Sequence, residues 1–219
     1  MGWDRVISVI SSSYVPNRLI DHEHCLGQAL DQERFEDRLA LDHLGVDDVL
    51  SLLDYSAYFS LSRTPLPEDR SHIIDAIRAA GLAMYDTSVG WAITNLGAVL
   101  FCKKFDHFPS LSRKALRVVT YRGENRVEAI REQVSGRGYA VGFDQMIQYV
   151  MEQIENGLGR SNSEIPEVVL RELIANALIH QDFTLCGTGP VVEIFDDRVE
   201  ITNPGQPLIP RERFVDSPP

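Results

Sequence analysis

One segment constrains this chain more than any other: PEVVLRELIANALIHQ, from Pro166 to Gln181. Drawn as a helix at roughly 100° per residue, it is apolar around most of its circumference. Its polar side chains Glu172, Asn176 and His180 fall within a stripe about 80° wide. Such a helix is predicted to be buried, and a buried carboxylate needs a partner, a metal or a ligand to offset its desolvation. We therefore expect the stripe to face a polar cavity and to mark a site; the alternative is a satisfied buried network.

The charge of the chain is unevenly distributed. The 219 residues are 44% hydrophobic and 24% charged, as in an ordinary globular protein, and carry a net charge of -11. This balance argues against wholesale non-specific nucleic-acid binding, which depends on neutralising phosphates. Residues 103–137, however, hold nine Lys and Arg against four Asp and Glu, a net charge of +5. We expect a local basic face there, with Arg113, Lys114 and Arg117 as candidate nucleic-acid contacts; a solvated surface is the alternative.

Cysteine usage and hydropathy indicate the cellular setting. The three cysteines are widely spaced, which suits a reducing compartment better than a disulfide framework. No apolar stretch approaches the roughly 18 residues of a membrane span, and the N-terminus lacks the apolar core of a signal peptide. We expect a soluble, cytoplasmic protein with no membrane partner. Asp21–Cys25 groups metal-ligand residue types, but no second cluster completes a zinc site, so we interpret it as a solvated helix face.

Residues 45–95 have the pattern of a small helical module closed by a hairpin. The periodic run 46–61 predicts one helix, and the run 72–80 predicts a second, with Asp69 or Ser71 as its N-cap. Residues 82–86 and 91–94 are typical of two strands around a turn. Two helices followed by a two-stranded wing form the outline of a winged-helix fold, for which a plain packing module is the alternative.

The rest of the chain alternates strands and helices. We expect a helix from a Thr94 or Asn95 cap, a strand over 115–123, a helix over 142–154, and two strands within 189–205 around an Asp196–Asp197 turn. Residues 125–134 fit a strand or a helix. The fold class that follows is α+β: a winged-helix-like helical module, then a mixed sheet covered by helices.

Two stretches give the chain a family resemblance: RELIANALIHQDF, and the strand pair that ends in ITNPGQPL. They resemble the C-terminal half of bacterial transcriptional regulators labelled RecG-like ATP-dependent DNA helicases. The resemblance extends back through GYAVGF, LSRKALRVVTYRG, WAITNLGAVLF and SLLDYSAYFSL to at least residue 40. It implies a Schlafen-type AlbA nucleic-acid-binding domain joined to an ATP-binding domain of the GHKL class.

The resemblance also implies how the chain is divided. Residues 1–40 would be the remnant of the upstream AlbA-type domain and a linker, residues 41–105 the winged-helix-like module, and residues 106–219 a partial GHKL-like domain. On this interpretation the chain is a fragment that lacks most of the AlbA domain and the C-terminal end. The fold would be a winged-helix-like module followed by a partial GHKL-like sandwich of a mixed sheet and helices.

The site residues come from the same resemblance. GHKL proteins carry an E-x-x-x-N box on this helix, which here is Glu172 to Asn176. An i, i+4 pair projects from one helix face. Glu172 would be the catalytic base that orients water, and Asn176 would be a ligand of the Mg²⁺ that accompanies ATP. His180 and Asp182 would continue this cofactor-binding edge towards the phosphates.

The family's glycine box, D-x-G-x-G, corresponds here to Asn203 and Gly205, also candidate cofactor-binding residues. Asn203 replaces the aspartate and Pro207 stands at the second glycine. No G-x-x-x-x-G-K-[ST] motif is present, so a P-loop helicase motor is not supported. The leading hypothesis is an ATP-binding transcriptional regulator that acts on DNA, with hydrolysis undecided. The alternative is a non-catalytic DNA- or protein-binding module on a degenerate nucleotide-binding fold.

DNA would be contacted through the missing upstream domain or through the basic segment 103–137. A homo-oligomer is compatible with either hypothesis.

Overall fold

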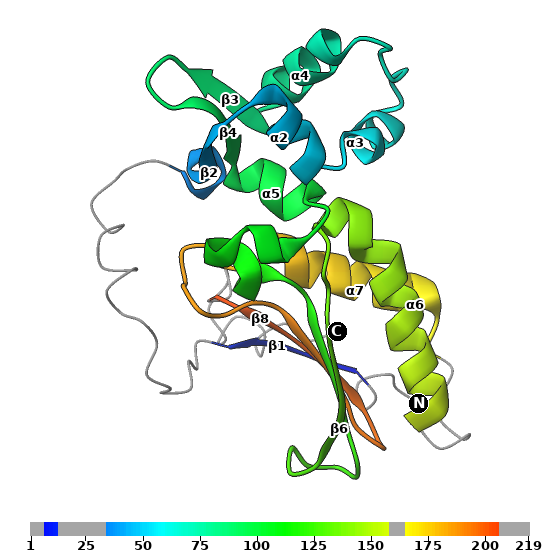
Figure 1. Cartoon of the computed structure of the whole chain (residues 1–219). Coiled ribbons are helices and arrows are strands. Elements are labelled where there is room, and N and C mark those ends of the chain that lie inside the picture. Colours follow the sequence, from blue (N-terminus) through cyan, green and yellow to red (C-terminus); the bar gives the residue numbers. More distant parts are fainter. Residues whose placement is uncertain (1–6, 13–33, 158–164, 206–219) are drawn as a thin grey trace, which may run out of the picture.

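The chain folds into two units that lie one above the other (Figure 1). The computed structural model describes residues 7–12, 34–157 and 165–205. Each unit has its own cluster of buried apolar side chains, one from residues 49–115 and one from residues 116–201. Helices accompany an antiparallel sheet in one unit and a mixed sheet in the other, which confirms the predicted α+β class. Within the described ranges, every helix is too short or too polar to cross a membrane.

The upper unit combines a three-stranded antiparallel sheet with short helices. The sheet has the order β2-β4-β3, and three helices precede the β3–β4 hairpin in the chain. The elements are η2 (Phe35–Asp37), β2 (Leu39–Leu44), α2 (Val46–Leu52), α3 (Tyr55–Ser62), α4 (Arg70–Ala79), β3 (Ala83–Asp86), β4 (Gly90–Thr94), α5 (Asn95–Phe101) and the 3-10 helices η3 (Phe105–His107) and η4 (Pro109–Lys114). The predicted hairpin is present, but three helices precede it where two were predicted, and β2 adds a third strand that was not predicted.

The predicted single helix over 46–61 is in fact two helices. The chain breaks at Leu53, which has extended backbone angles and forms a β-bridge with Cys102. Asp54 then caps α3, because its Oδ1 atom accepts hydrogen bonds from the amide of Ala57 at 3.2 Å and from the hydroxyl of Ser56 at 2.6 Å. Aspartate is a strong N-cap and a weak helix former. The cap therefore divides a run that apolar periodicity alone would leave continuous.

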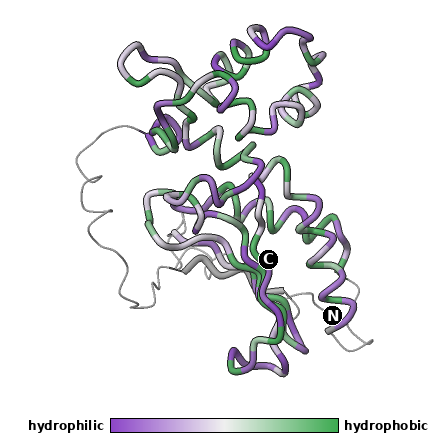
Figure 2. Tube along the Cα trace, in the orientation of Figure 1, coloured by the Kyte–Doolittle hydropathy of each residue, from purple (hydrophilic) through white to green (hydrophobic). Residues whose placement is uncertain are grey.

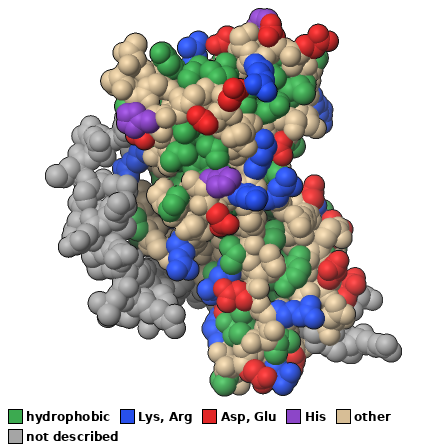
Figure 3. Space-filling model, in the orientation of Figure 1, with side chains coloured by type: hydrophobic (Ala, Val, Ile, Leu, Met, Phe, Trp, Pro, Cys, Tyr) green, Lys and Arg blue, Asp and Glu red, His purple; other side chains and the backbone are tan. Residues whose placement is uncertain are grey.

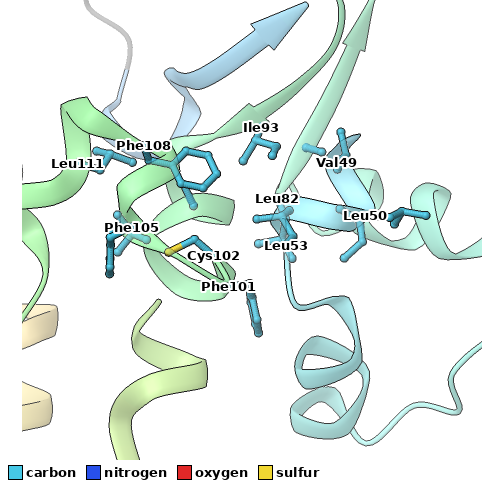
Figure 4. Packing of buried hydrophobic residues seen from close by; sticks show 14 of the residues in the cluster. Val49, Leu50, Leu53, Leu82, Ile93, Phe101, Cys102, Phe105, Phe108 and Leu111 are labelled. Atoms are coloured by element: carbon cyan, nitrogen blue, oxygen red, sulfur yellow. The ribbon is translucent and has the colours of Figure 1, made fainter. Parts of the chain in front are cut away.

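Helix α5 lies at the centre of the upper core. Thr94, one of the two predicted candidates, is its N-cap, since Oγ1 accepts a hydrogen bond from the amide of Gly97 at 3.1 Å. Gly97 also lies against Leu82, so close that a Cβ atom on the glycine would stand 2.0 Å from the Leu82 carbonyl oxygen. Figure 4 shows buried side chains from α5, the α2 region, the strands and the 3-10 helices packing together. This close approach requires a residue without a side chain at position 97.

The lower unit is a five-stranded mixed sheet with α6 and α7 against one face (Figure 1). The order is β1-β8-β7-β5-β6; β1 is parallel to β8 and β5 to β7, and the other neighbours are antiparallel. The elements are β1 (Ile7–Ser12), β5 (Arg117–Tyr121), β6 (Ala129–Val134), α6 (Tyr139–Gly157), α7 (Glu167–Ile179), β7 (Val191–Ile194) and β8 (Val199–Pro204). Both units contain hydrophobic and hydrophilic residues throughout (Figure 2). The ambiguous segment 125–134 contains strand β6.

Two expected boundaries differ from the structure. Residues 7–12, expected in the remnant of an upstream domain, form β1 and pair with β8 at one edge of the lower sheet. Residues 106–115, expected in the ATP-binding domain, contribute Phe108, Leu111 and Ala115 to the upper core. The first difference comes from a contact between segments distant in the sequence, which local patterns do not encode. The second comes from contacts of η4 with the neighbouring helix α5. The cluster Asp21–Cys25 lies outside the described residues.

Candidate functional site

Helix α7, which carries the predicted polar stripe, lies on the surface of the lower unit. The side chains that it buries against β8 and α6 are Leu170, Ile174, Ala177 and Leu178. On its outer side, Val168 and Ile179 are 71% and 66% exposed. The prediction that this helix is buried on nearly every side is therefore wrong. The reason is architectural: α7 rests on one face of a single sheet, and no described segment covers its other side.

Glu172 and Asn176 lie on this outer side, one turn apart. Both are exposed, and Nδ2 of Asn176 donates a hydrogen bond to Oε1 of Glu172 at 3.2 Å. His180, also exposed, follows one turn later as the C-cap residue. We call these three residues the polar ridge. The ridge is open to solvent among the described residues and does not line an enclosed cavity, so its carboxylate has little desolvation to offset.

The C-terminal end of α7 meets the end of β8. The amide of Asp182 donates a hydrogen bond to the carbonyl oxygen of Pro204 at 2.7 Å. Gly205 follows with φ at +137°, and a Cβ atom there would stand 3.2 Å from the nitrogen of Asp182. Asn203, at the end of β8, is buried. The structure thus brings Asp182 to the segment Asn203–Gly205, at the end of the helix that carries the polar ridge.

The oxygen atoms of the ridge suit a magnesium ion that arrives with ligands of its own. Because Asn176 directs Nδ2 to Glu172, its Oδ1 atom is the one left for a cation. The Oδ1 atom of Asp182 instead accepts hydrogen bonds from the amide and hydroxyl of Thr184, at 2.9 and 2.6 Å. Over the described ranges, no three His, Cys, Asp or Glu side chains form a metal-binding group. Mg²⁺ commonly uses one or two protein oxygens with waters and substrate phosphates, so the donor set fits an ion carried by a nucleotide.

Lys114 is buried, so the prediction that it contacts nucleic acid is wrong. It is 4% exposed, and its Nζ atom donates hydrogen bonds to the carbonyl oxygens of Leu185 at 2.7 Å and Asp182 at 3.3 Å. Nζ also lies 5.7 Å from the centre of the Phe183 ring. Burial lowers the pKa of this ammonium to about 8, against the opposing effects of Cys186 and Asp182. The side chain serves to tie the loop after α7 to the upper unit.

The basic segment 103–137 offers less free charge than its composition predicts. Arg117 is half-buried, with Nη1 3.5 Å from Oε1 of Glu132, whereas Arg113 is exposed. Within the part of the chain that the structure describes, only Lys104, Arg113 and Arg131 of the nine cations have side chains without a hydrogen bond or ion pair. Figure 3 shows Lys and Arg side chains interspersed with Asp and Glu on the visible face. Arg113 remains the best placed of the three predicted contacts.

A cluster of buried charges on the lower sheet was not predicted. Glu193 on β7 and Glu200 on β8 face each other and are 8% and 6% exposed. Arg126, from the β5–β6 loop, donates two hydrogen bonds of 2.7 Å to Glu193 and also reaches Glu200. Arg198 donates to Glu200 at 2.6 Å. The signal was available, because the two glutamates lie symmetrically about the Asp196–Asp197 turn, and hairpin pairing then sets them opposite each other.

Comparisons with known proteins found nothing similar to this chain: no protein-family model, no curated protein and no solved structure matched it. The resemblance to RecG-like regulators therefore stays a prediction, and a function has to be inferred from the geometry of the chain.

Proposed function

We propose that this chain is an ATP-binding transcriptional regulator that acts on DNA, with its nucleotide site on the outer side of α7. The observation that carries the proposal is the exposed pair of Glu172 and Asn176, joined by a hydrogen bond of 3.2 Å. The pair stands on a helix whose C-terminal end adjoins the segment Asn203–Gly205. Carboxylate and amide oxygens are suitable ligands for a metal ion bound to a phosphate chain. A glycine without a side chain lets the phosphates approach the backbone closely.

Each residue has its own role in this proposal. Asn176 ligates the metal through Oδ1, and Glu172 accepts a proton from water. His180 and Asp182 extend the edge along which the phosphates would lie, and Gly205 leaves room beside the strand end. When bound, Mg²⁺ neutralises the charge of the phosphates. The proposal includes the cytoplasm as location, where a reducing environment keeps thiols such as Cys102 and Cys186 free.

Isothermal titration with ATP and Mg²⁺ tests the site. We expect Asn176→Ala to weaken binding by at least about tenfold, which corresponds to the loss of roughly 1.4 kcal/mol of binding free energy. Asn156→Ala is the matched control, since Asn156 is an exposed amide on the neighbouring helix α6. Equal heats from the parent protein and Asn176→Ala would remove the site assignment, and so would the absence of any heat from the parent.

A non-catalytic binding module on the same fold is the second candidate. The open position of the polar ridge favours it, because the described residues provide no cover that would exclude water from a reacting phosphate. In this case DNA contacts would involve the exposed Arg113. Arg70 offers a comparison, since it begins α4 and pairs with Asp47.

DNA binding measured by fluorescence anisotropy at about 50 and 200 mM salt separates the two arginines. If the basic segment makes the contact, Arg113→Ala weakens binding and flattens its salt dependence, whereas Arg70→Ala does not. If the α4 helix makes the contact, Arg70→Ala weakens DNA binding and flattens its salt dependence, whereas Arg113→Ala does not. Unchanged binding by Arg113→Ala would exclude the basic segment from this function.

A further inference from the structure

The segment that follows α7 is held by both units at Asp182. We call residues 181–185 the junction loop. The Asp182 amide donates to the carbonyl oxygen of Pro204 in the lower unit at 2.7 Å, and its carbonyl oxygen accepts from Nζ of Lys114 in the upper unit at 3.3 Å. Its Oδ1 atom accepts two hydrogen bonds from Thr184. Within the described ranges Oδ2 has no hydrogen-bond partner, so the surroundings fix this carboxylate and leave one oxygen for a ligand.

Phe183 anchors the junction loop in the core of the upper unit. Its ring stacks on that of Phe35, with the ring centroids 4.8 Å apart, and it packs against the buried apolar cluster of residues 49–115. Phe35 is itself fixed, because its carbonyl oxygen accepts a hydrogen bond from Nδ2 of Asn95 in α5 at 3.0 Å. Stacked aromatic rings prefer particular arrangements. The junction loop therefore belongs to the upper core as well as to the end of α7.

Gln181 and Tyr139 form a second anchor between the units. Gln181 is 5% exposed, and its Nε2 atom donates to the hydroxyl of Tyr139 at 2.8 Å and to the carbonyl oxygen of Leu178 at 2.9 Å. The Tyr139 hydroxyl in turn donates to the carbonyl oxygen of Lys114 at 2.6 Å. Tyr139 begins α6 and packs against the apolar clusters of both units. The last turn of α7 is thereby connected through α6 to η4 of the upper unit.

We propose that Tyr139, Gln181 and Lys114 are positioning residues that hold Asp182 at the edge along which the phosphates would lie. The inference rests on the proposed function, in which Asp182 extends the nucleotide site of α7. The three side chains act through the junction loop and do not themselves contact the nucleotide. Binding groups keep a productive geometry only where neighbouring hydrogen bonds and packing fix them. The upper unit thus completes a site whose other residues lie on α7 and β8.

Amide hydrogen exchange at Asp182 tests this positioning without any nucleotide. Tyr139→Phe keeps the ring and removes the hydroxyl that joins Gln181 to Lys114. We expect the Asp182 amide to exchange at least about fivefold faster relative to a buried α6 amide, the factor that corresponds to the loss of one hydrogen bond. Tyr121→Phe is the matched control, since it also removes one tyrosine hydroxyl hydrogen bond but lies away from the junction loop.

Titration with ATP and Mg²⁺ tests the role of these residues in binding. We expect Tyr139→Phe to raise the dissociation constant at least about fivefold, and Tyr121→Phe to leave it unchanged. Lys114→Met removes the two hydrogen bonds that the upper unit donates to the junction loop, so it should change both measurements in the same direction as Tyr139→Phe. This second variant tests the contribution of the upper unit directly.

The outcomes separate this inference from the proposed function. A parent protein that binds no ATP would refute the proposed function, whatever the exchange rates are. Exchange at Asp182 that stays unchanged in both Tyr139→Phe and Lys114→Met would overturn the positioning, whether or not ATP binds. Faster exchange with an unchanged dissociation constant would also overturn it, because Asp182 would then move without any cost to nucleotide binding.

Discussion

Replacement of Lys114 by methionine tests how the protein holds a buried ammonium group. In the native structure Nζ donates to two backbone carbonyl oxygens, and burial lowers the pKa of the side chain from 10.5 to about 8. Methionine fills a similar volume but has no charge and does not titrate. The variant therefore loses two hydrogen bonds and also loses the desolvation penalty of the charge. The loss of the hydrogen bonds and the loss of the desolvation penalty depend differently on pH, so unfolding measurements at two pH values separate them.

The sign of the pH effect follows from the two pKa values. The unfolded chain holds the Lys114 proton up to about pH 10.5, whereas the folded chain releases it near pH 8. The unfolded state thus binds more protons between these values, so the stability that depends on Lys114 rises with pH there. The penalty is fully present below about pH 8. At 1.36 kcal/mol per pKa unit, the whole difference corresponds to about 3 kcal/mol, of which about 2 kcal/mol falls between pH 7.5 and 10.

Urea unfolding of both proteins at pH 7.5 and at pH 10 measures this difference. All other titrating groups are shared, so they cancel when the free energy of unfolding of Lys114→Met is subtracted from that of the parent. We expect the parent to gain about 2 kcal/mol relative to the variant at the higher pH. A difference that is the same at both pH values would show that Lys114 keeps an ordinary pKa and would refute the reasoning.

Three further substitutions probe contacts in both units. Thr94→Ala removes the N-cap of α5 and should lower the free energy of unfolding by about 1–2 kcal/mol, measured by urea unfolding against the exposed control Thr87→Ala. Gly97→Ala places a Cβ atom 2.0 Å from a backbone oxygen and should cost about 3 kcal/mol; an unchanged thermal midpoint would contradict the close approach. Arg126→Ala leaves two buried carboxylates facing each other and should cost about 2 kcal/mol, because the arginine is half-exposed. Addition of Glu193→Gln to Arg126→Ala should restore part of the loss, and a further decrease would argue against repulsion.

Elements with strong local signals were predictable from the sequence. Thr94 begins α5 because its hydroxyl caps the helix, and the turn at Asp196–Asp197 joins β7 to β8 as predicted. The break between α2 and α3 was missed because an aspartate in a periodic run can stand either as a helix residue or as a cap. The β-bridge between Leu53 and Cys102, a tertiary contact, ends α2 at this point and leaves Asp54 as the N-cap of α3.

The environment of the candidate site was less predictable. Val168 and Ile179 are apolar, so their presence around α7 indicated burial, yet both are exposed. Apolar side chains around a helix show which of its faces would be stabilised by burial. They do not show whether another segment of the chain covers those faces. Lys114 shows the converse case, since a lysine in a basic segment is normally at the surface. Its burial depends on the loop of residues 182–185, which follows almost 70 residues later in the chain.

The pairing of β1 with β8 determines the order in which this protein can be assembled. Closing a loop of about 190 residues carries a large entropic cost, and contacts between distant segments form slowly. The core of residues 49–115 needs neither strand and can form while the ribosome is still translating the remainder. A nascent chain that ends at α6 would hold an upper unit that still lacks its contacts with the loop after α7, beside an incomplete lower sheet. During that interval the unpaired strands are the part of the chain most exposed to aggregation and most dependent on chaperones.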